Sequence, residues 1–184
     1  MRVGIDVDGV VADFVLSFTS LAKEMGLVKE VYPTAQQKDW SFPFDTNPVW
    51  ERVKASYNWW MTLQPLVSLT EIAHLNAALM AHDIYFVTSR PRTLGLSAER
   101  QTACWLEGIG VSVVMATVIA TKTGTKGALM KSLDIDVAID DYILNLEDID
   151  QHGIKAFARS WSYNEGWPVR VGDLSTLLRI VGVK

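Results

Sequence analysis

Two hydrophobic patterns alternate along most of the chain. Short, nearly continuous apolar runs predict buried strands, and segments whose apolar residues recur every three or four positions predict amphipathic helices. Strand and helix in succession are typical of a parallel sheet with helices on both faces. The predicted strands are residues 2–7, 83–89, 111–117, 136–141 and 153–158, and the predicted helices are residues 13–26, 68–82, 96–110, 125–134 and 174–182.

Residues 27–66 break this alternation, because prolines and aromatic residues are crowded there. We interpret them as a small helical cap inserted after the first strand–helix unit, with its clearest helix at residues 47–63. Residues 1–26 and 67–184 then form a Rossmann-like α/β core. The aromatic residues of the inserted segment include Trp40, Phe42, Phe44, Trp50, Tyr57, Trp59 and Trp60.

Local signals mark the ends of two helices that follow the inserted segment. Ser68 is followed three residues later by Glu71, which is the pattern of a capping box. Ser97 is the predicted N-cap of the next helix, which should stop near Gly108.

Composition and charge limit the class of protein. The 184 residues suffice for one sizeable core, and the net charge of −4 without any run of Lys and Arg argues against a nucleic-acid polymer as partner. No apolar run reaches membrane-spanning length, and three early aspartates interrupt the apolar core that a signal peptide needs. Cys104 is the only cysteine, which excludes an intrachain disulfide. Because a chain without disulfides fits a reducing compartment, we expect a cytoplasmic protein. The oligomeric state stays open, a homodimer included.

Polar side chains cluster where three predicted strands end. Asp6 and Asp8 close the first strand, Thr88 and Ser89 close the second, and the pair at 140–141 closes a later one. Ligands of parallel sheets bind at the carboxyl edge of the strands. If the three strands are neighbours, carboxylates and hydroxyls therefore converge on one rim.

Converging carboxylates repel one another and need a counter-charge, which a hard divalent cation such as Mg²⁺ would supply. Lys126, in the first turn of a predicted helix, is a further source of positive charge. One aspartate of the first strand can act as a nucleophile on phosphorus, and the other as a general acid and base. Gly9 lets the chain turn sharply beside a bound phosphate.

Four ordered segments resemble the motifs of the haloacid dehalogenase-like (HAD) superfamily, and most closely those of its 5'(3')-deoxyribonucleotidases. They are DVDGVVADF at 6–14, FVTS at 86–89, Lys126, and IDD at 139–141. WWMTLQPL at 59–66 is similar to the aromatic cap segment of these nucleotidases. SYN at 162–164, with VRV soon after, resembles a late loop of related bacterial and phage enzymes.

The resemblance implies a role for each residue of these segments. It implies that Asp6 is the nucleophile and a metal ligand, and that Asp8 is the acid and base with its backbone carbonyl on the metal. Asp140 and Asp141 would hold Mg²⁺ directly or through water, and we favour Asp141 as the direct ligand. The phosphate would be bound by Thr88, Ser89, Gly9 and Lys126. Lys122 and Lys131 lie close enough to leave the choice of lysine open.

The aromatic residues and Arg90 have two interpretations each. Trp59 and Trp60 are adjacent, so one can pack while the other faces substrate, where stacking on a base would stabilise a nucleotide. Trp50, Val53 and Tyr57 have helical spacing that favours a place in the core of the cap. Arg90 can reach the substrate or lie in a solvated loop, and Trp161, Tyr163 and Trp167 can line the entrance or only pack.

These observations predict a Mg²⁺-dependent phosphomonoester hydrolase that forms an aspartyl-phosphate on Asp6, with a nucleoside monophosphate as the favoured substrate. A phosphatase for another small phosphate, such as a sugar phosphate, is the first alternative. A non-catalytic nucleotide-binding or regulatory module is the second. Asp8 argues against dehalogenation, because the dehalogenases that share this plan lack an acid–base aspartate two residues after the nucleophile.

Overall fold

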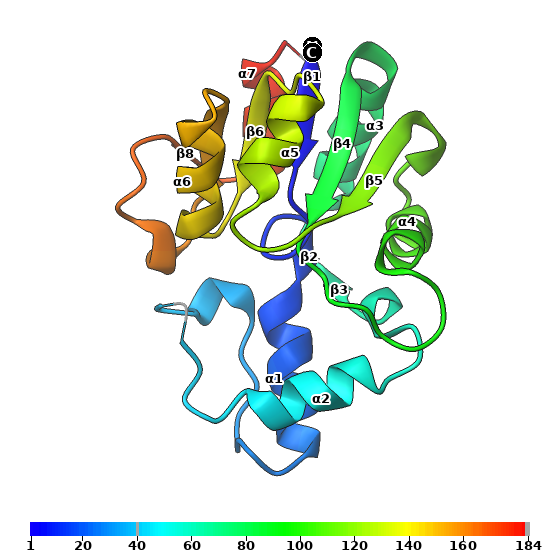
Figure 1. Cartoon of the computed structure of the whole chain (residues 1–184), viewed down its shortest axis with the longest axis vertical. Coiled ribbons are helices and arrows are strands. Elements are labelled where there is room, and N and C mark those ends of the chain that lie inside the picture. The colour runs from blue at the N-terminus through cyan, green and yellow to red at the C-terminus, as the bar shows by residue number, and fades with distance from the viewer. Residues whose placement is uncertain (40, 183–184) are drawn as a thin grey trace.

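A six-stranded parallel sheet forms the centre of the larger part of the molecule (Figure 1). The structure is a computed structural model that describes residues 1–39 and 41–182, so Trp40 and residues 183–184 lie outside the described part. The strands are β5 (Ala116–Ala120), β4 (Asp83–Thr88), β1 (Arg2–Ile5), β6 (Val137–Asp140), β7 (Lys155–Arg159) and β8 (Arg170–Val171), in that spatial order. Strands β1 and β6 are therefore central.

Alternation along β1 gives the sheet its two apolar faces. Val3 and Ile5 belong to one buried cluster, together with residues of α3 (Leu69–Ala81) and α7 (Leu174–Ile180). Gly4 points the other way, where a Cβ atom would lie 3.0 Å from Cε of Met130. That second face carries α5 (Lys126–Ser132) and α6 (Ile143–Gln151), so the predicted Rossmann-like arrangement is confirmed. In Figure 1, α5 lies in front of the sheet and α3 behind it.

Both predicted helix caps are present. The Ser68 hydroxyl accepts from the backbone N–H of Glu71 at 3.2 Å, and the Glu71 carboxylate accepts from the backbone N–H of Ser68 at 2.9 Å. The Ser97 hydroxyl accepts from the Arg100 amide and begins α4 (Ala98–Gly108).

The inserted segment folds on α1 (Phe14–Glu24) rather than on the sheet (Figure 1). Phe14 of α1 stacks on Trp50 of α2 (Asn47–Lys54) and Phe18 packs against the same ring at a tilt, with ring centroids 5.6 and 4.8 Å apart. The short antiparallel pair of β2 (Ala12–Asp13) and β3 (Gln64–Pro65) joins the residues just before α1 to the end of the inserted segment. The division into a core of 1–26 and 67–184 and a cap of 27–66 stays a prediction.

Asp13, the third early aspartate, fixes the entry to this segment. Its carboxylate accepts from the amide of Leu16, which caps α1, and from the amide and hydroxyl of Thr34 at 2.9 and 2.7 Å. Asp13 therefore stabilises the fold and lies outside the group of strand-end carboxylates.

Two predicted elements have different bounds in the structure. The helix predicted over 47–63 ends at Lys54, because Asn58 adopts a left-handed conformation (φ 52°) and a separate 3₁₀ turn follows at Trp59–Met61. The strand predicted over 111–117 begins only at Ala116, because Val111 closes α4 through its N–H to Leu106 and a 3₁₀ turn occupies Val113–Met115. Helix α6 and strand β8 were not predicted.

Within residues 1–39 and 41–182, no helix is both long enough and apolar enough to cross a bilayer. The expectation of a cytoplasmic location stays a prediction.

Candidate active site

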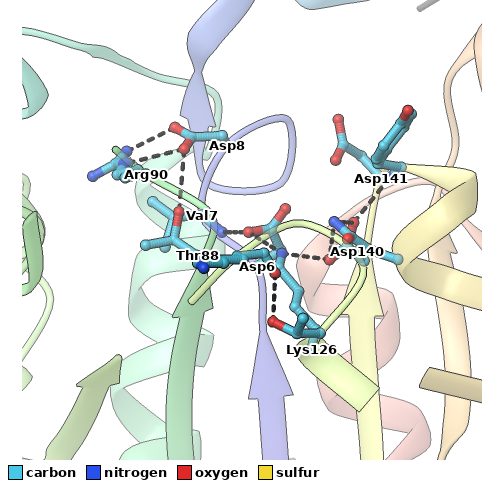
Figure 2. Close-up of polar contacts among 12 residues, drawn as sticks. Asp6, Val7, Asp8, Thr88, Arg90, Lys126, Asp140 and Asp141 are labelled. Carbon is cyan, nitrogen blue, oxygen red and sulfur yellow. Dashed lines mark hydrogen bonds and ion pairs between the residues drawn. The ribbon is translucent and has the colours of Figure 1, made fainter. Parts of the chain in front are cut away.

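The strand-end residues predicted from the sequence meet at the carboxyl edge of the sheet. Ile5 of β1 pairs with Phe86 of β4 on one side and with Ile139 of β6 on the other. Asp6 follows directly, and its amide donates to the Ile139 carbonyl at 2.9 Å. In Figure 2, Asp6 lies between Asp8 on one side and the Asp140–Asp141 pair on the other.

Asp6, Asp140 and Asp141 form a buried acidic cluster. One carboxylate oxygen from each lies within 4.8 Å of the others. Burial raises the pKa of Asp6 to about 8, with the charge of Asp140 adding to the rise and Lys126 opposing it. Burial, followed by the charges of Asp6 and Asp140, also raises the pKa of Asp141 well above its ordinary value. The three ionised carboxylates are therefore unfavourable together unless positive charge is nearby.

Lys126 supplies one positive charge to this cluster. It is the first residue of α5 and is fully buried, and its amino group lies 2.8 Å from Oδ1 of Asp6 and 2.6 Å from Oδ2 of Asp140. Burial opposes its charge, but Asp140 and Asp6 together raise its pKa above the usual range. Lys122 and Lys131, the two sequence alternatives, are exposed.

Neighbouring residues hold Asp140 and the start of α5 together. The Asp140 carboxylate accepts from the amide of Tyr142 at 2.9 Å and from the side-chain amide of Asn145 at 3.2 Å. The carbonyl oxygen of the same Asn145 side chain accepts from the amide of Gly124, in the loop before α5. One asparagine thus links the carboxylate with the loop that delivers Lys126.

The loop after β7 encloses the other side of the cluster. The Tyr163 hydroxyl donates to Oδ2 of Asp141 at 2.6 Å, and the Asn164 side chain donates to the Asp141 carbonyl at 2.8 Å. The Trp161 indole donates to the Gly9 carbonyl at 2.7 Å. Gly9 has φ +76°, and a Cβ atom there would collide with the Asp141 carboxylate. This position therefore requires glycine, for the turn and for the close approach of Asp141.

Asp8 lies on the other side of Asp6 from the Asp140–Asp141 pair (Figure 2), and it contacts Arg90. Arg90 donates through Nε and Nη2 to the two oxygens of Asp8 at 2.9 and 2.7 Å, and the Thr88 hydroxyl donates to Oδ2 of Asp8 at 3.2 Å (Figure 2). Both donors, predicted as phosphate or substrate contacts, are thus directed at a protein carboxylate in this structure.

A pocket of about 170 Å³ opens above the cluster. Ser89 lines it, and the buried hydroxyl of Ser89 has no hydrogen-bond partner among the described residues. Trp60 lines it too, whereas Trp59 faces a different hollow beside α1. The full lining is Asp6, Asp8, Phe14, Trp50, Trp60, Ser89, Thr123, Lys126, Asp141, Tyr142 and Asn145. The aromatic rings of Phe14, Trp50 and Trp60, here called the aromatic wall, therefore lie in the same pocket as the carboxylates and Lys126.

The charges and donor atoms of the site fit a divalent cation. If all four carboxylates are ionised, Asp6, Asp8, Asp140 and Asp141 face two cations, Lys126 and Arg90, and two negative charges are left for an ion to compensate. The cluster offers only oxygen ligands, which suit Mg²⁺ better than softer metals. Both oxygens of Asp140 accept hydrogen bonds, Oδ2 from Lys126 and Oδ1 from Tyr142 and Asn145. Lys126 contacts Oδ1 of Asp6 and Tyr163 contacts Oδ2 of Asp141, so the second oxygen of each of these two carboxylates is best placed to hold an ion.

The fold is similar to solved structures of haloacid dehalogenase-like hydrolases. A haloacid dehalogenase-like hydrolase from Streptococcus pneumoniae is 11% identical with a TM-score of 0.62, and the match covers 98% of this chain and 97% of that one. An L-2-haloacid dehalogenase is 12% identical with a TM-score of 0.58, covering 98% and 99%. CbbY from Rhodobacter sphaeroides, solved in complex with phosphate, is 14% identical with a TM-score of 0.54, covering 96% and 95%.

No protein-family model and no curated protein matches the sequence. At these identities the structural similarity establishes a HAD-like fold for the chain.

Proposed function

We propose that the protein is a Mg²⁺-dependent phosphomonoester hydrolase that works through an aspartyl-phosphate on Asp6. The observation that carries this proposal is the buried contact of Lys126 with Asp6 at the floor of a pocket that Asp8 and Ser89 also line. These groups are a nucleophile, a cation, a hydroxyl donor and a second carboxylate, which together are what phosphoryl transfer requires.

In the first half of the reaction, a carboxylate oxygen of Asp6 attacks phosphorus. The new O–P bond forms as the bond from phosphorus to the leaving oxygen breaks, and protonated Asp8 gives its proton to that oxygen. Lys126 and the Ser89 hydroxyl stabilise the negative charge on the phosphoryl oxygens. The alcohol leaves, and Asp6 carries the phosphoryl group.

In the second half, water breaks the intermediate. Asp8, now ionised, takes a proton from the water as its oxygen attacks phosphorus, and the O–P bond to Asp6 breaks. Inorganic phosphate leaves, and Asp6 is restored as a carboxylate with Asp8 protonated for the next cycle. A Mg²⁺ ion would be held by Asp6, Asp141 and the carbonyl of Asp8, and it would supply positive charge at the phosphoryl oxygens.

Asp8 separates this proposal from dehalogenation, although an L-2-haloacid dehalogenase is among the structurally similar proteins. Halide leaves without a proton, so a dehalogenase has no need for an acid beside the leaving group. An ionisable carboxylate that lines the pocket two residues after the nucleophile fits an alkoxide leaving group instead.

The aromatic wall supports a nucleoside monophosphate as the substrate. Phe14 and Trp50 line the pocket above Asp6 and also an adjoining hollow of about 450 Å³, where Phe42 and Phe44 continue the aromatic surface. A flat base attached to a sugar phosphate would extend over this surface, and base–aromatic stacking contributes about 1–3 kcal/mol per base.

A sugar phosphate is the second candidate, because CbbY was solved with xylulose-1,5-bisphosphate and shares this fold at a TM-score of 0.54.

Phosphate release from a panel of nucleoside 5'- and 3'-monophosphates and sugar phosphates tests the proposal. Each substrate is assayed with Mg²⁺ and with chelator. We expect Mg²⁺-dependent release that is fastest with nucleotides. Release from sugar phosphates alone would keep the mechanism and overturn the nucleotide assignment. No release from any substrate by folded protein that binds Mg²⁺ would favour a non-catalytic binding module.

A further inference from the structure

Arg90 is buried behind the carboxylate of Asp8. Its side chain is 0% exposed, whereas that of Asp8 is 20% exposed, so the arginine lies on the protein side of the pair and the carboxylate on the pocket side. Asp8 lines the pocket above Asp6, and Arg90 does not. Arg90 therefore acts on the pocket through the lining residues that it contacts, Asp8 and Trp60.

The three donors to Asp8 are shared unequally between its two oxygens. Among the residues that the structure describes, Oδ2 accepts from Nε of Arg90 and from the Thr88 hydroxyl, and Oδ1 accepts from Nη2 of Arg90 alone. Because a carboxylate oxygen has two acceptor positions, Oδ2 is filled and Oδ1 keeps one position. The bidentate contact also fixes the plane of the carboxylate, which a single point charge cannot do.

Arg90 is itself held from three sides. Its Nη1 donates to the hydroxyl of Thr102 in α4 at 2.8 Å. Its guanidinium lies 4.8 Å from the ring centroid of Trp60 and 5.9 Å from that of Trp105. The Trp60 indole donates to the carbonyl of Pro91, the residue next to Arg90, at 2.9 Å. Trp60, whose ring lines the pocket, thus packs against the Arg90 guanidinium that holds Asp8.

We propose that Arg90 is a positioning residue that fixes Asp8 for proton transfer through Oδ1 and links this position to Trp60 in the pocket wall. This inference rests on the proposed function. It differs from the sequence-based expectation that Arg90 contacts the substrate, because the side chain is 0% exposed and its three nitrogens each donate to an oxygen of Asp8 or Thr102.

Arg90→Lys tests this role, since lysine keeps the positive charge but cannot form the bidentate contact or the flat stack on Trp60. An acid matters most when the leaving group is a poor one. We expect kcat/KM, which reports the steps up to release of the alcohol, to fall by about 10- to 100-fold for nucleotides and other alkyl phosphates. For 4-nitrophenyl phosphate, whose leaving group needs no proton, kcat/KM should stay near the wild-type value.

Two further variants separate positioning from a loss of structure. Arg92→Lys makes the same chemical change at an exposed arginine two residues along and should leave all rates unchanged. Thr102→Val removes the hydroxyl that accepts from Nη1 of Arg90 and donates to the Ala98 carbonyl within α4. Thr102 lies outside the pocket, and we expect a smaller loss with the same dependence on the leaving group. Thermal unfolding of each variant establishes that the compared proteins are folded.

The alternatives give different results. If Arg90 bound the phosphate, Arg90→Lys would raise KM for every substrate, 4-nitrophenyl phosphate included, and the positioning role would be overturned. Wild-type kinetics in Arg90→Lys would also overturn it while leaving the proposed function intact. Failure of the wild-type protein to hydrolyse any phosphomonoester would defeat the proposed function and, with it, this role of Arg90.

Discussion

The amino group of Lys126 lies 2.8 Å from Oδ1 of Asp6, and both side chains are buried. The ion pair joins the end of the first strand to the start of a helix late in the chain, at the carboxyl edge of the sheet. A buried lysine in contact with the proposed nucleophile is placed to neutralise charge there before and after phosphoryl transfer.

Replacing Lys126 by methionine should lower kcat by about 100- to 1000-fold, the loss typical for one donor that stabilises developing charge. The change also leaves Asp6 and Asp140 without their shared cation. Steady-state phosphate release measures it, with Lys131→Met, an exposed lysine of the same helix, as the matched control. Equal losses in the two variants would contradict the choice of Lys126.

Asp6→Asn should raise the melting temperature of the metal-free protein at about pH 8. Burial disfavours the ionised Asp6 carboxylate, as its raised pKa of about 8 indicates, and asparagine keeps the shape without the charge. Differential scanning fluorimetry in chelator checks this, with exposed Asp150→Asn as the control. A lower melting temperature for Asp6→Asn would mean that the ion pair with Lys126 outweighs the cost of burial.

The stability of the metal-free protein should fall as the pH rises from about 4 to about 8. In this window the native Asp6 keeps its proton while the unfolded chain has lost it, so the unfolded state binds fewer protons and a rise in pH favours unfolding. Mg²⁺ binds the ionised carboxylates of the native state, so its stabilising effect should grow over the same range. Melting temperatures with Mg²⁺ and with chelator measure both trends. An increment from Mg²⁺ that did not change with pH would contradict the carboxylate site.

Tyr163→Phe should weaken Mg²⁺ binding by about 10- to 100-fold, the usual cost of removing a group that orients a metal ligand. The phenol donates to Oδ2 of Asp141 at 2.6 Å, and phenylalanine keeps the ring without this bond. Isothermal titration calorimetry gives the dissociation constants. Tyr57→Phe, at a residue that is 75% exposed, is the control. Unchanged affinity in Tyr163→Phe would show that Asp141 is oriented by other contacts or is not a direct ligand.

Trp50→Leu should raise KM for nucleoside monophosphates by about 5- to 160-fold, which corresponds to the 1–3 kcal/mol of base stacking. Glycerol phosphate, which has no ring, serves as the control substrate, and its KM should not change. Trp50 is partly exposed and lines both the pocket and the adjoining aromatic hollow. A parallel rise in KM for both substrates would mean that Trp50 shapes the pocket without contacting a base.

The sheet and the rim of polar residues could be predicted because their signals are local and repeated. Each parallel strand is a short apolar run, and the residues just after such runs must lie on the same edge. Asp6, Thr88 and Asp140 are therefore brought together by strand order alone. The position of Lys126 could be predicted for a similar reason, because a local apolar pattern predicts the helix that it begins.

Sequence patterns could not predict which side chains contact these residues. Tyr163 lies in a 3₁₀ turn (Ser162–Asn164) that is too short for a periodic pattern to predict its direction, and its contact with Asp141 depends on how β7 and β8 hold that turn. The segment SYN and the nearby tryptophans indicated this region but not the contact. The direction of Arg90 is a tertiary property, since a loop arginine two residues past a strand can turn to solvent, ligand or protein. The early end of α2 depends on the left-handed Asn58, which no helical spacing reveals.

Mass analysis of protein quenched in acid during turnover tests the central claim most directly. With 4-nitrophenyl phosphate or the best nucleotide and Mg²⁺, we expect a mass gain of one phosphoryl group on the peptide that contains Asp6. The gain should be absent in chelator and in Asp6→Asn. Hydrolysis that continues in Asp6→Asn, or a phosphoryl group on any other peptide, would contradict the assignment of Asp6 as the nucleophile.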